Sequence, residues 1–375
     1  MRIGIDVGPV TQRPTGVGNY CRNLFSTLVE ECRDDSFVAF SASMHPPALG
    51  SAGPRVTMRH FPAPTRALYG LWSTVGLPRI EAMTGPVDVY HATNFFLPPA
   101  RTCGRVLTIH DLGFLVVPEM CSPKIVGPFS KRMRRFAAEA DVVLADSEAT
   151  RQDILRLLEV PPAKVVAAPL AAGKDLRPMD RDEARRVVRE RHGLHEPYLL
   201  FVSTLEPRKN VTGLLRVFAR LRDRIPHRLV LVGATGWNAD PIVEAIATLG
   251  ISDRVVRLGF APGNDLNALY SAADVFVFPS YYEGFGLPVL EAMTCGCPVV
   301  TSNRSSLPEV VGEAGTMCEP DDHAAIAEAV MRLIEDGAAR ERAVARGLAQ
   351  AATFSWSACA AITREAYERA ASCVS

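Results

Sequence analysis

The sequence predicts an α/β protein that contains two doubly wound domains, each built on a parallel β-sheet. Short runs rich in Val, Ile, Leu and Phe recur along the 375-residue chain, with little alternation between apolar and polar residues. Such runs are typical of parallel strands that are covered on both faces. Helix-compatible stretches lie between many of the runs, as in βαβ units. The length suits two domains of roughly 150–200 residues each.

Expected strands and helices alternate along most of the chain. The apolar runs that we expect to form strands are Arg2–Val7, Phe37–Ser41, Val87–His91, Val106–His110, Val142–Asp146, Val165–Ala168, Tyr198–Ser203, Arg228–Val232, Val255–Leu258, Val275–Pro279 and Pro298–Thr301. The clearest expected helices are Asn19–Glu31, Ser147–Leu158, Val211–Arg224 and Asp240–Leu249. Doubly wound sheets bind ligands at the carboxyl ends of their strands, so polar residues that follow these runs are candidate site residues.

The alternation breaks once, in a charged segment before Tyr198. Asp180–Arg191 has few apolar positions and predicts either an interdomain linker helix or an exposed cover helix. The strand series then restarts. We therefore expect a first Rossmann-like domain, a linker, a second Rossmann-like domain and a terminal helix at residues 1–172, 173–196, 197–353 and 354–375. Two such domains place their crevices face to face, so the active site is expected in the cleft between them.

Composition excludes several classes of protein. Lys plus Arg and Asp plus Glu both number 41, which gives no bulk reason to expect a nucleic-acid partner. The nine cysteines form no framework, and Cys295 and Cys297 lack a second pair at zinc spacing, so we expect reduced thiols of a cytoplasmic protein. The N-terminus has no long apolar run that would mark a signal peptide. No run of 18 apolar residues predicts a transmembrane helix.

In the first domain, glycines and a histidine follow expected strands. Gly16 and Gly18 precede a helical run, where backbone N–H groups either approach an anion or merely form a tight turn. His110 ends an apolar strand, where it either serves the crevice or hydrogen-bonds the loop backbone. Asp111 either orients that imidazole or caps the following turn. The segment Arg66–Trp72 has an apolar-aromatic character, which suits the lining of a binding site in this domain.

The second domain opens with two cations after a strand. Ser203 and Thr204 end that strand, and Arg208 and Lys209 follow in the loop. Two positive side chains at this edge suit a diphosphate. The alternative is a solvated pair before a helix that Asn210 caps. Gly233 ends the next strand, again at the edge that faces the crevice.

The most informative segment is Pro279–Met293, in which a strand, a glycine loop and a helix follow one another. A helix that begins near Leu287 directs the backbone amides of Phe285, Gly286 and Leu287 toward a phosphate. Glu291, one turn further on, is placed to accept both hydroxyls of a ribose. Glu283, in the loop, is placed to accept hydrogen bonds from a sugar. The alternative is two unrelated surface glutamates that flank a capped helix.

These motifs resemble the retaining GT-B glycosyltransferases of family 4, whose hallmark is two glutamates separated by seven residues, here Glu283 and Glu291. The resemblance covers nearly the whole chain. It includes the Gly16–Gly18 loop, His110, Pro207–Asn210, Gly259–Phe260 and Ser302–Glu309. It implies a GT-B fold in which the first domain binds the acceptor and the second binds the nucleotide sugar. It also implies that the terminal helix crosses back onto the first domain.

The resemblance also implies roles for individual residues. Glu291 would bind the ribose, Glu283 the donor sugar, and the amides of Phe285–Leu287 the phosphate and sugar. Lys209 and a nearby Arg would neutralise the leaving diphosphate, and His110 would touch the transferred sugar. One departure concerns the end of the first strand of the second domain. Many members carry an Arg there, where this chain has Ser203-Thr204, so that role passes either to Arg208 or to Thr204.

The expected function is hexosyl transfer, and the donor that the motif phrasing favours is GDP-mannose. The acceptor would be a saccharide or a lipid-linked saccharide. Alternatives are a UDP-glucose-type glucosyltransferase, a GT-B nucleotide-sugar epimerase or phosphorylase, and a two-domain binding protein. The only Asp-x-Asp, at Asp180–Asp182, precedes no strand-end loop, so no essential metal or other cofactor is expected. The basic cluster Lys131, Arg132, Arg134 and Arg135 is either a site for peripheral contact with anionic lipid at the inner membrane face or a solvated helix face.

Overall fold

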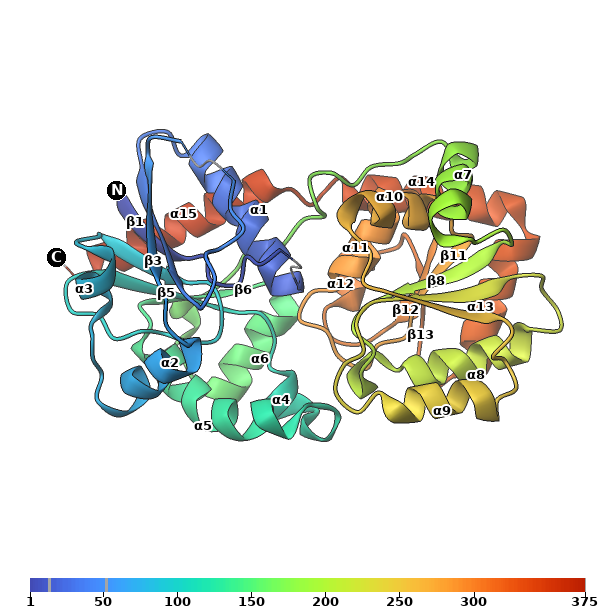
Figure 1. Cartoon of the computed structure of the whole chain (residues 1–375), viewed down its shortest axis with the longest axis horizontal. Coiled ribbons are helices and arrows are strands. Elements are labelled where there is room, and N and C mark those ends of the chain that lie inside the picture. Colours follow the sequence, from blue (N-terminus) through green and yellow to red (C-terminus); the bar gives the residue numbers. More distant parts are fainter. Residues whose placement is uncertain (13–14, 51–52, 375) are drawn as a thin grey trace. The chain divides into compact units, whose positions relative to one another are not determined.

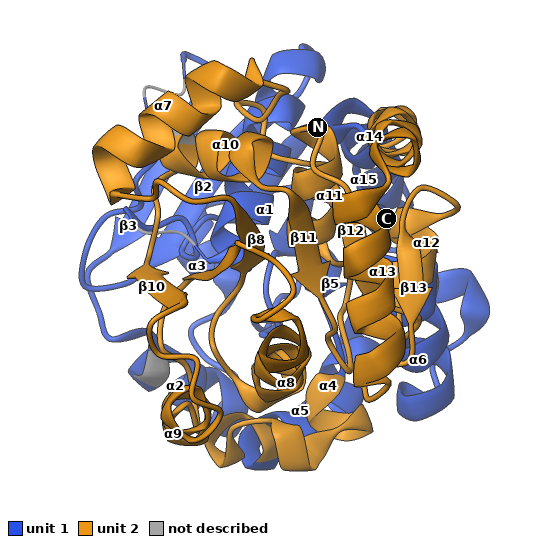
Figure 2. Ribbon diagram, turned by 90° about the vertical axis from the view of Figure 1, so that its right-hand side faces the viewer, with its two compact units in different colours: residues 1–112, 127–170, 355–375 blue, residues 113–126, 171–354 orange. Residues whose placement is uncertain are grey.

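The computed structural model describes residues 1–12, 15–50 and 53–374, apart from the side chains of residues 66 and 264. The chain divides into two compact units (Figures 1 and 2). Unit 1 contains residues 1–112, 127–170 and 355–375, and unit 2 contains residues 113–126 and 171–354. Each unit is built on its own parallel sheet, which confirms the expected fold class. A cleft between the domains stays a prediction.

Unit 1 has a parallel sheet in the order β3-β2-β1-β4-β5-β6-β7. The strands are β1 (Arg2–Asp6), β2 (Ser36–Ala42), β3 (Val56–Phe61), β4 (Val89–Ala92), β5 (Gly104–Ile109), β6 (Val142–Ala145) and β7 (Val165–Ala167). The order reverses between β1 and β4, which pair in parallel. This point is therefore the topological switch point, where doubly wound sheets bind their ligands.

Helices cover the strands of unit 1. They are α1 (Gly16–Glu31), α2 (Thr65–Thr74), α3 (Ile80–Thr84), α6 (Glu148–Leu158), α15 (Trp356–Ser372) and most of α5 (Pro123–Glu139). The terminal helix α15 packs against α1, β5 and β6, so the last residues of the chain belong to the first unit (Figure 1). Gly104 explains how closely it packs, because a Cβ there would lie 2.3 Å from the carbonyl oxygen of Ala370.

Unit 2 has a parallel sheet in the order β10-β9-β8-β11-β12-β13. Its strands are β8 (Tyr198–Val202), β9 (Arg228–Val232), β10 (Val255–Gly259), β11 (Val275–Phe278), β12 (Val299–Ser302) and β13 (Thr316–Cys318). The residues of β8, β9, β11 and β12 are almost all buried, as expected for strands covered on both faces. The switch point lies between β8 and β11.

The helices of unit 2 are α4 (Gly113–Val116), α7 (Arg181–His192), α8 (Val211–Leu221), α9 (Asp240–Thr248), α10 (Gly263–Ala272), α11 (Leu287–Thr294), α12 (Leu307–Val311), α13 (His323–Glu335) and α14 (Gly337–Ala351). Three-residue 3₁₀ turns lie at Pro118–Met120 and Pro207–Lys209 in unit 2 and at Pro162–Lys164 in unit 1. The helix expected in the linker is α7, and it packs on α10 within unit 2. Arg191 pairs with Asp265 across this contact. Of the two alternatives for this charged helix, the structure therefore has the cover helix.

The structure contains two strands that the sequence did not predict, and both lie at sheet edges. Val56–Phe61 forms β3, whose residues are half-buried or exposed and include Arg59 and His60. Thr316–Cys318 forms β13 and is only three residues long. An edge strand needs no continuous apolar run, so the signal that finds the central strands is absent here. Within the described residues, no helix is both long and apolar enough to cross a membrane.

Candidate active site

A buried ion pair lies at the carboxyl edge of the second sheet. Lys209 Nζ lies 2.7 Å from both carboxylate oxygens of Glu283, and both side chains are buried. The lysine comes from the turn after β8 and the glutamate from the loop after β11, and these two strands are neighbours in the sheet. Lys209 Nζ also lies 5.7 Å from the centre of the Phe278 ring. The parallel topology thus brings together two charges that are 74 residues apart in the sequence.

Serine hydroxyls hold the Glu283 loop in place. Ser280 Oγ donates to Glu283 Oε1 at 2.6 Å, and the backbone N–H of Glu283 donates to Ser305 Oγ at 2.8 Å. Ser306 Oγ lies within 3.0 Å of the carbonyl oxygens of Glu283 and Phe285. The Ser302–Glu309 segment of the resemblance therefore acts on the glutamate loop, and it fixes the direction in which the carboxylate points.

Arg208 contacts the same loop from a different side. Its Nη1 donates to the carbonyl oxygen of Tyr282 at 2.8 Å and lies 3.7 Å from Glu283 Oε2, and its Nη2 donates to Glu206 at 3.1 Å. Asn210 caps α8 by accepting from the backbone N–H of Gly213, as expected. The alternative of a solvated cation pair is wrong, because Lys209 is buried and Arg208 is largely enclosed.

Gly233 has a steric reason to be glycine. Its φ is +138°, and a Cβ on it would lie 2.0 Å from the carbonyl oxygen of Ser203. Thr204 is exposed, and its methyl group faces Gly236. A cavity of about 400 Å³ opens beside these turns and is lined by Leu205, Leu231, Gly233, Ala234, Thr235, Arg257, Leu258 and Gly259. The strand ends of β9 and β10 thus provide space for a ligand at the same edge as Glu283.

The helix after the Glu283 loop starts as the sequence predicts. Gly286 has a φ of +105° and precedes α11, which carries Pro288 in its first turn. No side chain in the described part of the chain caps this helix. The first amides of a helix lack intrahelical acceptors, and an anion is a suitable partner for them. Phe285 and Leu287 flank the glycine at this N-terminus.

Glu291 lies further along α11 in an apolar setting. Its carboxylate accepts a hydrogen bond from Tyr270 Oη at 2.9 Å. Burial raises the pKa of Glu291 to about 7, although the tyrosine hydrogen bond opposes the shift. A carboxylate with so few protein partners at this edge is suited to accept ligand hydroxyls.

The first-unit candidates are grouped around α1 and β5. Gly16 and Gly18 lie in the first turn of α1, so the helix starts earlier than the expected Asn19. His110 is buried, with Nδ1 2.8 Å from Asp146 Oδ2 and Nε2 2.9 Å from the carbonyl oxygen of Thr93. Burial by itself would lower the pKa of His110, but the Asp146 carboxylate outweighs burial and raises it. The carboxylate of Asp146 and the carbonyl oxygen of Thr93 thus hold the His110 ring in one orientation.

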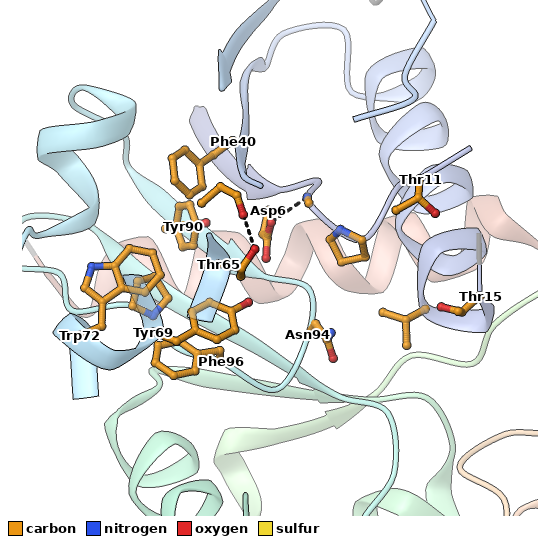
Figure 3. Close-up of a pocket in the computed structure, with 15 residues that line it drawn as sticks. Asp6, Thr11, Thr15, Phe40, Thr65, Tyr69, Trp72, Tyr90, Asn94 and Phe96 are labelled. Atoms are coloured by element: carbon orange, nitrogen blue, oxygen red, sulfur yellow. Dashed lines mark hydrogen bonds between the residues drawn. The ribbon is translucent and has the colours of Figure 1, made fainter. Parts of the chain in front are cut away.

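A second cavity, of about 320 Å³, lies in unit 1 at the switch point of its sheet (Figure 3). Tyr69 and Trp72 of α2 line it, and both belong to the aromatic segment singled out in the sequence. Asp6 and Asn94 also line it, and sequence reasoning missed both. Asp6 ends β1, so a carboxylate at a strand end was the available signal. Burial raises the pKa of Asp6 to about 6, against the effect of the Gly8 backbone N–H.

The basic cluster lies on α5, and half of its charge is paired. Arg134 lies 2.7 Å from Glu159, and Arg135 lies 2.7 Å from Glu139. Lys131 and Arg132 are exposed. The nine cysteines are free thiols, as expected. Among the side chains that the structure describes, no group of three His, Cys, Asp or Glu residues is arranged to hold a metal ion.

Comparison with protein families and with known proteins identifies the chain's relatives. Residues 15–171 match the glycosyl transferase 4-like domain, and residues 181–350 match the glycosyl transferases group 1. The chain is 40% identical over 283 residues to the O-antigen chain mannosyltransferase B of Escherichia coli, covering 75% of this chain and 74% of that protein. It is 30% identical over 354 residues to a D-inositol 3-phosphate glycosyltransferase of Stackebrandtia nassauensis, covering 86% and 79%.

The fold of unit 1 and unit 2 also has solved counterparts. Sucrose-phosphate synthase from Thermosynechococcus elongatus matches with a TM-score of 0.79 and 23% identity, and the match covers 98% of each chain. That likeness shows the GT-B fold, and the sequence matches show the family. The glutamates and cations at the edge of the second sheet therefore belong to a protein with the glycosyltransferase fold. The chain is a member of the group 1 glycosyltransferases.

Proposed function

We propose that the chain transfers mannose from GDP-mannose to a saccharide or lipid-linked saccharide, with retention of the anomeric configuration. The observation that carries a nucleotide-sugar donor is the Lys209–Glu283 pair, held next to the uncapped N-terminus of α11. A diphosphate needs cations and helix amides, and a sugar needs a fixed carboxylate. The 40% identity to a mannosyltransferase supports mannose as the transferred sugar.

In this proposal, different residues of unit 2 bind different parts of the donor. Lys209 and the amides of Phe285–Leu287 neutralise the diphosphate, and Glu283 accepts hydroxyls of the sugar. Glu291 accepts the ribose hydroxyls, and Gly233 borders the cavity at the ends of β9 and β10. Arg208 holds the Glu283 loop through Tyr282 and adds positive charge 3.7 Å from the carboxylate. It takes over the strand-end arginine role better than Thr204, which is exposed.

For the chemical step we propose front-face substitution. Cleavage of the anomeric bond builds negative charge on the leaving diphosphate, and preorganised donors lower that barrier. The leaving phosphate oxygen then takes the proton from the acceptor hydroxyl. A double displacement would need a free carboxylate as nucleophile, whereas Glu283 is bonded to Lys209 and Ser280. Product NMR should show the donor's anomeric configuration, and a glycosyl adduct trapped on a side chain would contradict the front-face route.

The donor is tested by thermal shift with GDP-mannose, UDP-glucose and ADP-glucose. Binding to the native state raises the melting temperature according to the affinity, so GDP-mannose is expected to give the largest shift. A larger shift with UDP-glucose would replace the proposed donor by the glucosyltransferase alternative. Product analysis without acceptor separates the epimerase alternative, since an epimerase would convert its donor alone. No shift with any nucleotide sugar would overturn the proposed function.

Metal independence is a further expectation of this assignment. Lys209 and the α11 amides provide positive charge where a divalent cation would otherwise act. EDTA at 5–10 mM is in roughly thousandfold excess over contaminating metal. At this concentration we expect transfer rates to stay within about twofold of those in buffer without chelator. A rate that falls to background in chelator and returns with Mg²⁺ or Mn²⁺ would show that a metal is required.

A lipid-linked acceptor also suggests weak peripheral contact with anionic membranes through α5. Lys131 and Arg132 are exposed, and each cation near an anionic surface contributes about 1 kcal/mol. We expect flotation with phosphatidylglycerol vesicles at low salt and its loss at high salt. Ser in place of Lys131, Arg132, Arg134 and Arg135 should abolish flotation, whereas Ser in place of Arg185, Arg186 and Arg189 on α7 should not. Equal behaviour of both variants would remove α5 from the proposal.

A further inference from the structure

A chain of hydrogen bonds ties the carboxyl edge of the first sheet together. Thr93 Oγ1 donates to the carbonyl oxygen of Asp6 at 2.7 Å, and the carbonyl oxygen of Thr93 lies 2.9 Å from His110 Nε2. His110 Nδ1 lies 2.8 Å from Asp146 Oδ2. Asp6 ends β1, and the other three residues directly follow β4, β5 and β6, which are neighbours in that order. Thr93, His110 and Asp146 are buried, so the chain joins four strand ends within the protein interior.

The two partners of His110 determine where its ring protons lie. A carbonyl oxygen can only accept, so the contact with Thr93 requires a proton on His110 Nε2. The contact with Asp146 then requires one further proton between Nδ1 and Oδ2. That proton belongs either to the ring beside a carboxylate or to the carboxyl group beside a neutral ring. In both cases the pair shares one proton and carries no net charge, and neither ring nitrogen has a free lone pair.

Aromatic rings pack against the imidazole on two sides. The ring centroid of Tyr20 lies 4.8 Å from that of His110, and the centroid of Phe95 lies 6.0 Å from it. Both rings are close to perpendicular to the imidazole, at 79° and 88°. Tyr20 is itself held in place, because its Oη lies 2.9 Å from Thr108 Oγ1. A net charge is costly in such surroundings, so the rings favour the pair that keeps its shared proton.

The other titratable groups around the pair lie on β4, α1, α15 and the residue after His110, and they are His91, Tyr20, Cys359 and Asp111. Burial lowers the pKa of His91 to about 3 and raises the pKa of Cys359 to about 12. Burial also raises the pKa of Tyr20 well above its ordinary value. These three groups are therefore uncharged near neutral pH. Asp111 adds negative charge, which favours retention of the shared proton.

The electrostatics of the pair point in the same direction as its geometry. Burial by itself would lower the pKa of His110, but the Asp146 carboxylate raises it above the ordinary value of 6.5. Burial also raises the pKa of Asp146, against the effect of His110. The folded protein therefore holds the shared proton more tightly than the unfolded chain. Its contribution to the native state is present below about pH 6.5 and is lost as the pH rises through the raised pKa.

We propose that His110 and Asp146 act as one unit whose shared proton holds the Thr93 carbonyl, and that Asp146 is thereby a positioning residue of the active site. Loss of the proton leaves the carboxylate with the single remaining ring N–H, so that a bare Nε2 faces the Thr93 carbonyl oxygen. Two acceptors repel each other, and the end of β4 is then no longer held. Asn94, which lines the cavity of unit 1, directly follows Thr93. Transfer should therefore decline at alkaline pH.

The shared proton also limits what His110 can do in the reaction. With both ring nitrogens engaged, His110 has no lone pair with which to take the proton of an acceptor hydroxyl. This agrees with the proposed front-face route, in which the leaving phosphate oxygen takes that proton. The inference rests on the proposed function, because mannosyl transfer is one of its two readouts. It adds the role of Asp146 and the direction of the pH dependence.

The first test compares kcat against pH in wild type and Asp146→Asn, at saturating GDP-mannose. The new amide can donate to Nδ1 of a neutral ring, so Nε2 keeps its proton and its bond to Thr93 without a titrating partner. At neutral pH we expect kcat of Asp146→Asn within about threefold of wild type. Between about pH 7 and about pH 10 the wild-type kcat should fall by roughly tenfold or more, as the displacement of positioned groups does, and that of the variant should not. Coincident profiles would overturn the proposal.

Asp141 provides the matched control. It lies just before β6, at the opposite end of the strand that Asp146 follows, and it accepts the backbone N–H of Arg105 at 2.7 Å. Asp141→Asn should therefore keep the wild-type pH profile. A profile as flat as that expected for Asp146→Asn would contradict the proposal, because the effect would then not depend on contact with His110.

The second test observes the proton itself and needs no activity. In protein labelled with ring-¹⁵N histidine, two-bond ¹H–¹⁵N correlations distinguish protonated from bare ring nitrogens, and the His110 signals are those missing from His110→Gln. At neutral pH we expect a proton on Nε2 in both wild type and Asp146→Asn, and at about pH 10 only in the variant. A bare wild-type Nε2 at neutral pH would overturn the proposal, as would a wild-type Nε2 that keeps its proton at the higher pH.

Failure of the proposed function looks different from failure of this inference. In the first case GDP-mannose gives neither a thermal shift nor transfer, while the ring spectra of His110 still show the expected protons. In the second case the enzyme transfers mannose, but wild type and Asp146→Asn respond to pH in the same way.

Discussion

Replacing Lys209 by Met should lower kcat for mannosyl transfer by about 10²–10³-fold. Lys209 is the buried cation of the proposed donor site, and it lies 2.7 Å from the Glu283 carboxylate. In a site that excludes water, one preorganised charge stabilises a developing diphosphate far more than the same charge in solvent. Met keeps much of the apolar stem and removes only the ammonium group. Steady-state kinetics with saturating GDP-mannose measure the effect, and a kcat within threefold of wild type would exclude Lys209 from leaving-group stabilisation.

The structural consequence of the same change must be separated from the catalytic one. Without Lys209, the Glu283 carboxylate stays buried with Ser280 and the more distant Arg208 as partners. Breaking a buried ion pair costs about 3–5 kcal/mol when the remaining charge has no partner, so about 2–3 kcal/mol is expected here. The double variant Lys209→Met/Glu283→Gln removes both charges and should regain most of the lost stability without regaining activity. Recovery of activity in the double variant would indicate that the single variant fails only because it unfolds.

The sequence predicts the central strands well because their physical signal is strong. The strands β8, β9, β11 and β12 are buried on both faces. Side chains on both faces must therefore be apolar, and the sequence shows continuous apolar runs. The same reasoning locates strand ends, and therefore it locates Lys209 and Glu283 at one edge. The start of α11 at Leu287 is also predicted, because a glycine with φ of +105° and a proline in the first turn mark it.

Partners across the fold were beyond the reach of sequence reasoning. Nothing local indicates that Lys209 binds Glu283 rather than solvent, since the contact depends on β8 and β11 being neighbours. His110 shows the same limit: the sequence places it at a strand end, but Asp146 and Thr93 come from two other strand ends. Both ring nitrogens are engaged by these two partners, which the strand-end position alone does not reveal.

Glu291→Gln should strengthen the folded state at pH 8 while weakening donor binding by about 10–100-fold, as the loss of one or two charge-assisted hydrogen bonds does. In the folded chain the pKa of Glu291 is raised to about 7 by burial, from an ordinary value of 4.5. Ionisation therefore costs the native state more than the unfolded state, and this penalty grows from about pH 4.5 and is complete above about 7. The neutral Gln avoids it. Because Glu291 is only half-buried, solvent reduces the gain to about 1–2 kcal/mol.

The pH profile of donor binding gives the sharper test of Glu291. GDP-mannose carries a diphosphate diester whose charge is constant between pH 5.5 and 8.5, roughly the range around the Glu291 pKa, so protein groups cause any change there. Wild-type affinity should rise as pH increases through about 7, because the ionised carboxylate accepts ribose hydroxyls more strongly. Tyr270→Phe removes the hydrogen bond that lowers the pKa of Glu291, so its profile should move to higher pH. Calorimetric titration at several pH values measures both, and a wild-type profile as flat as that of Glu291→Gln would place the ribose elsewhere.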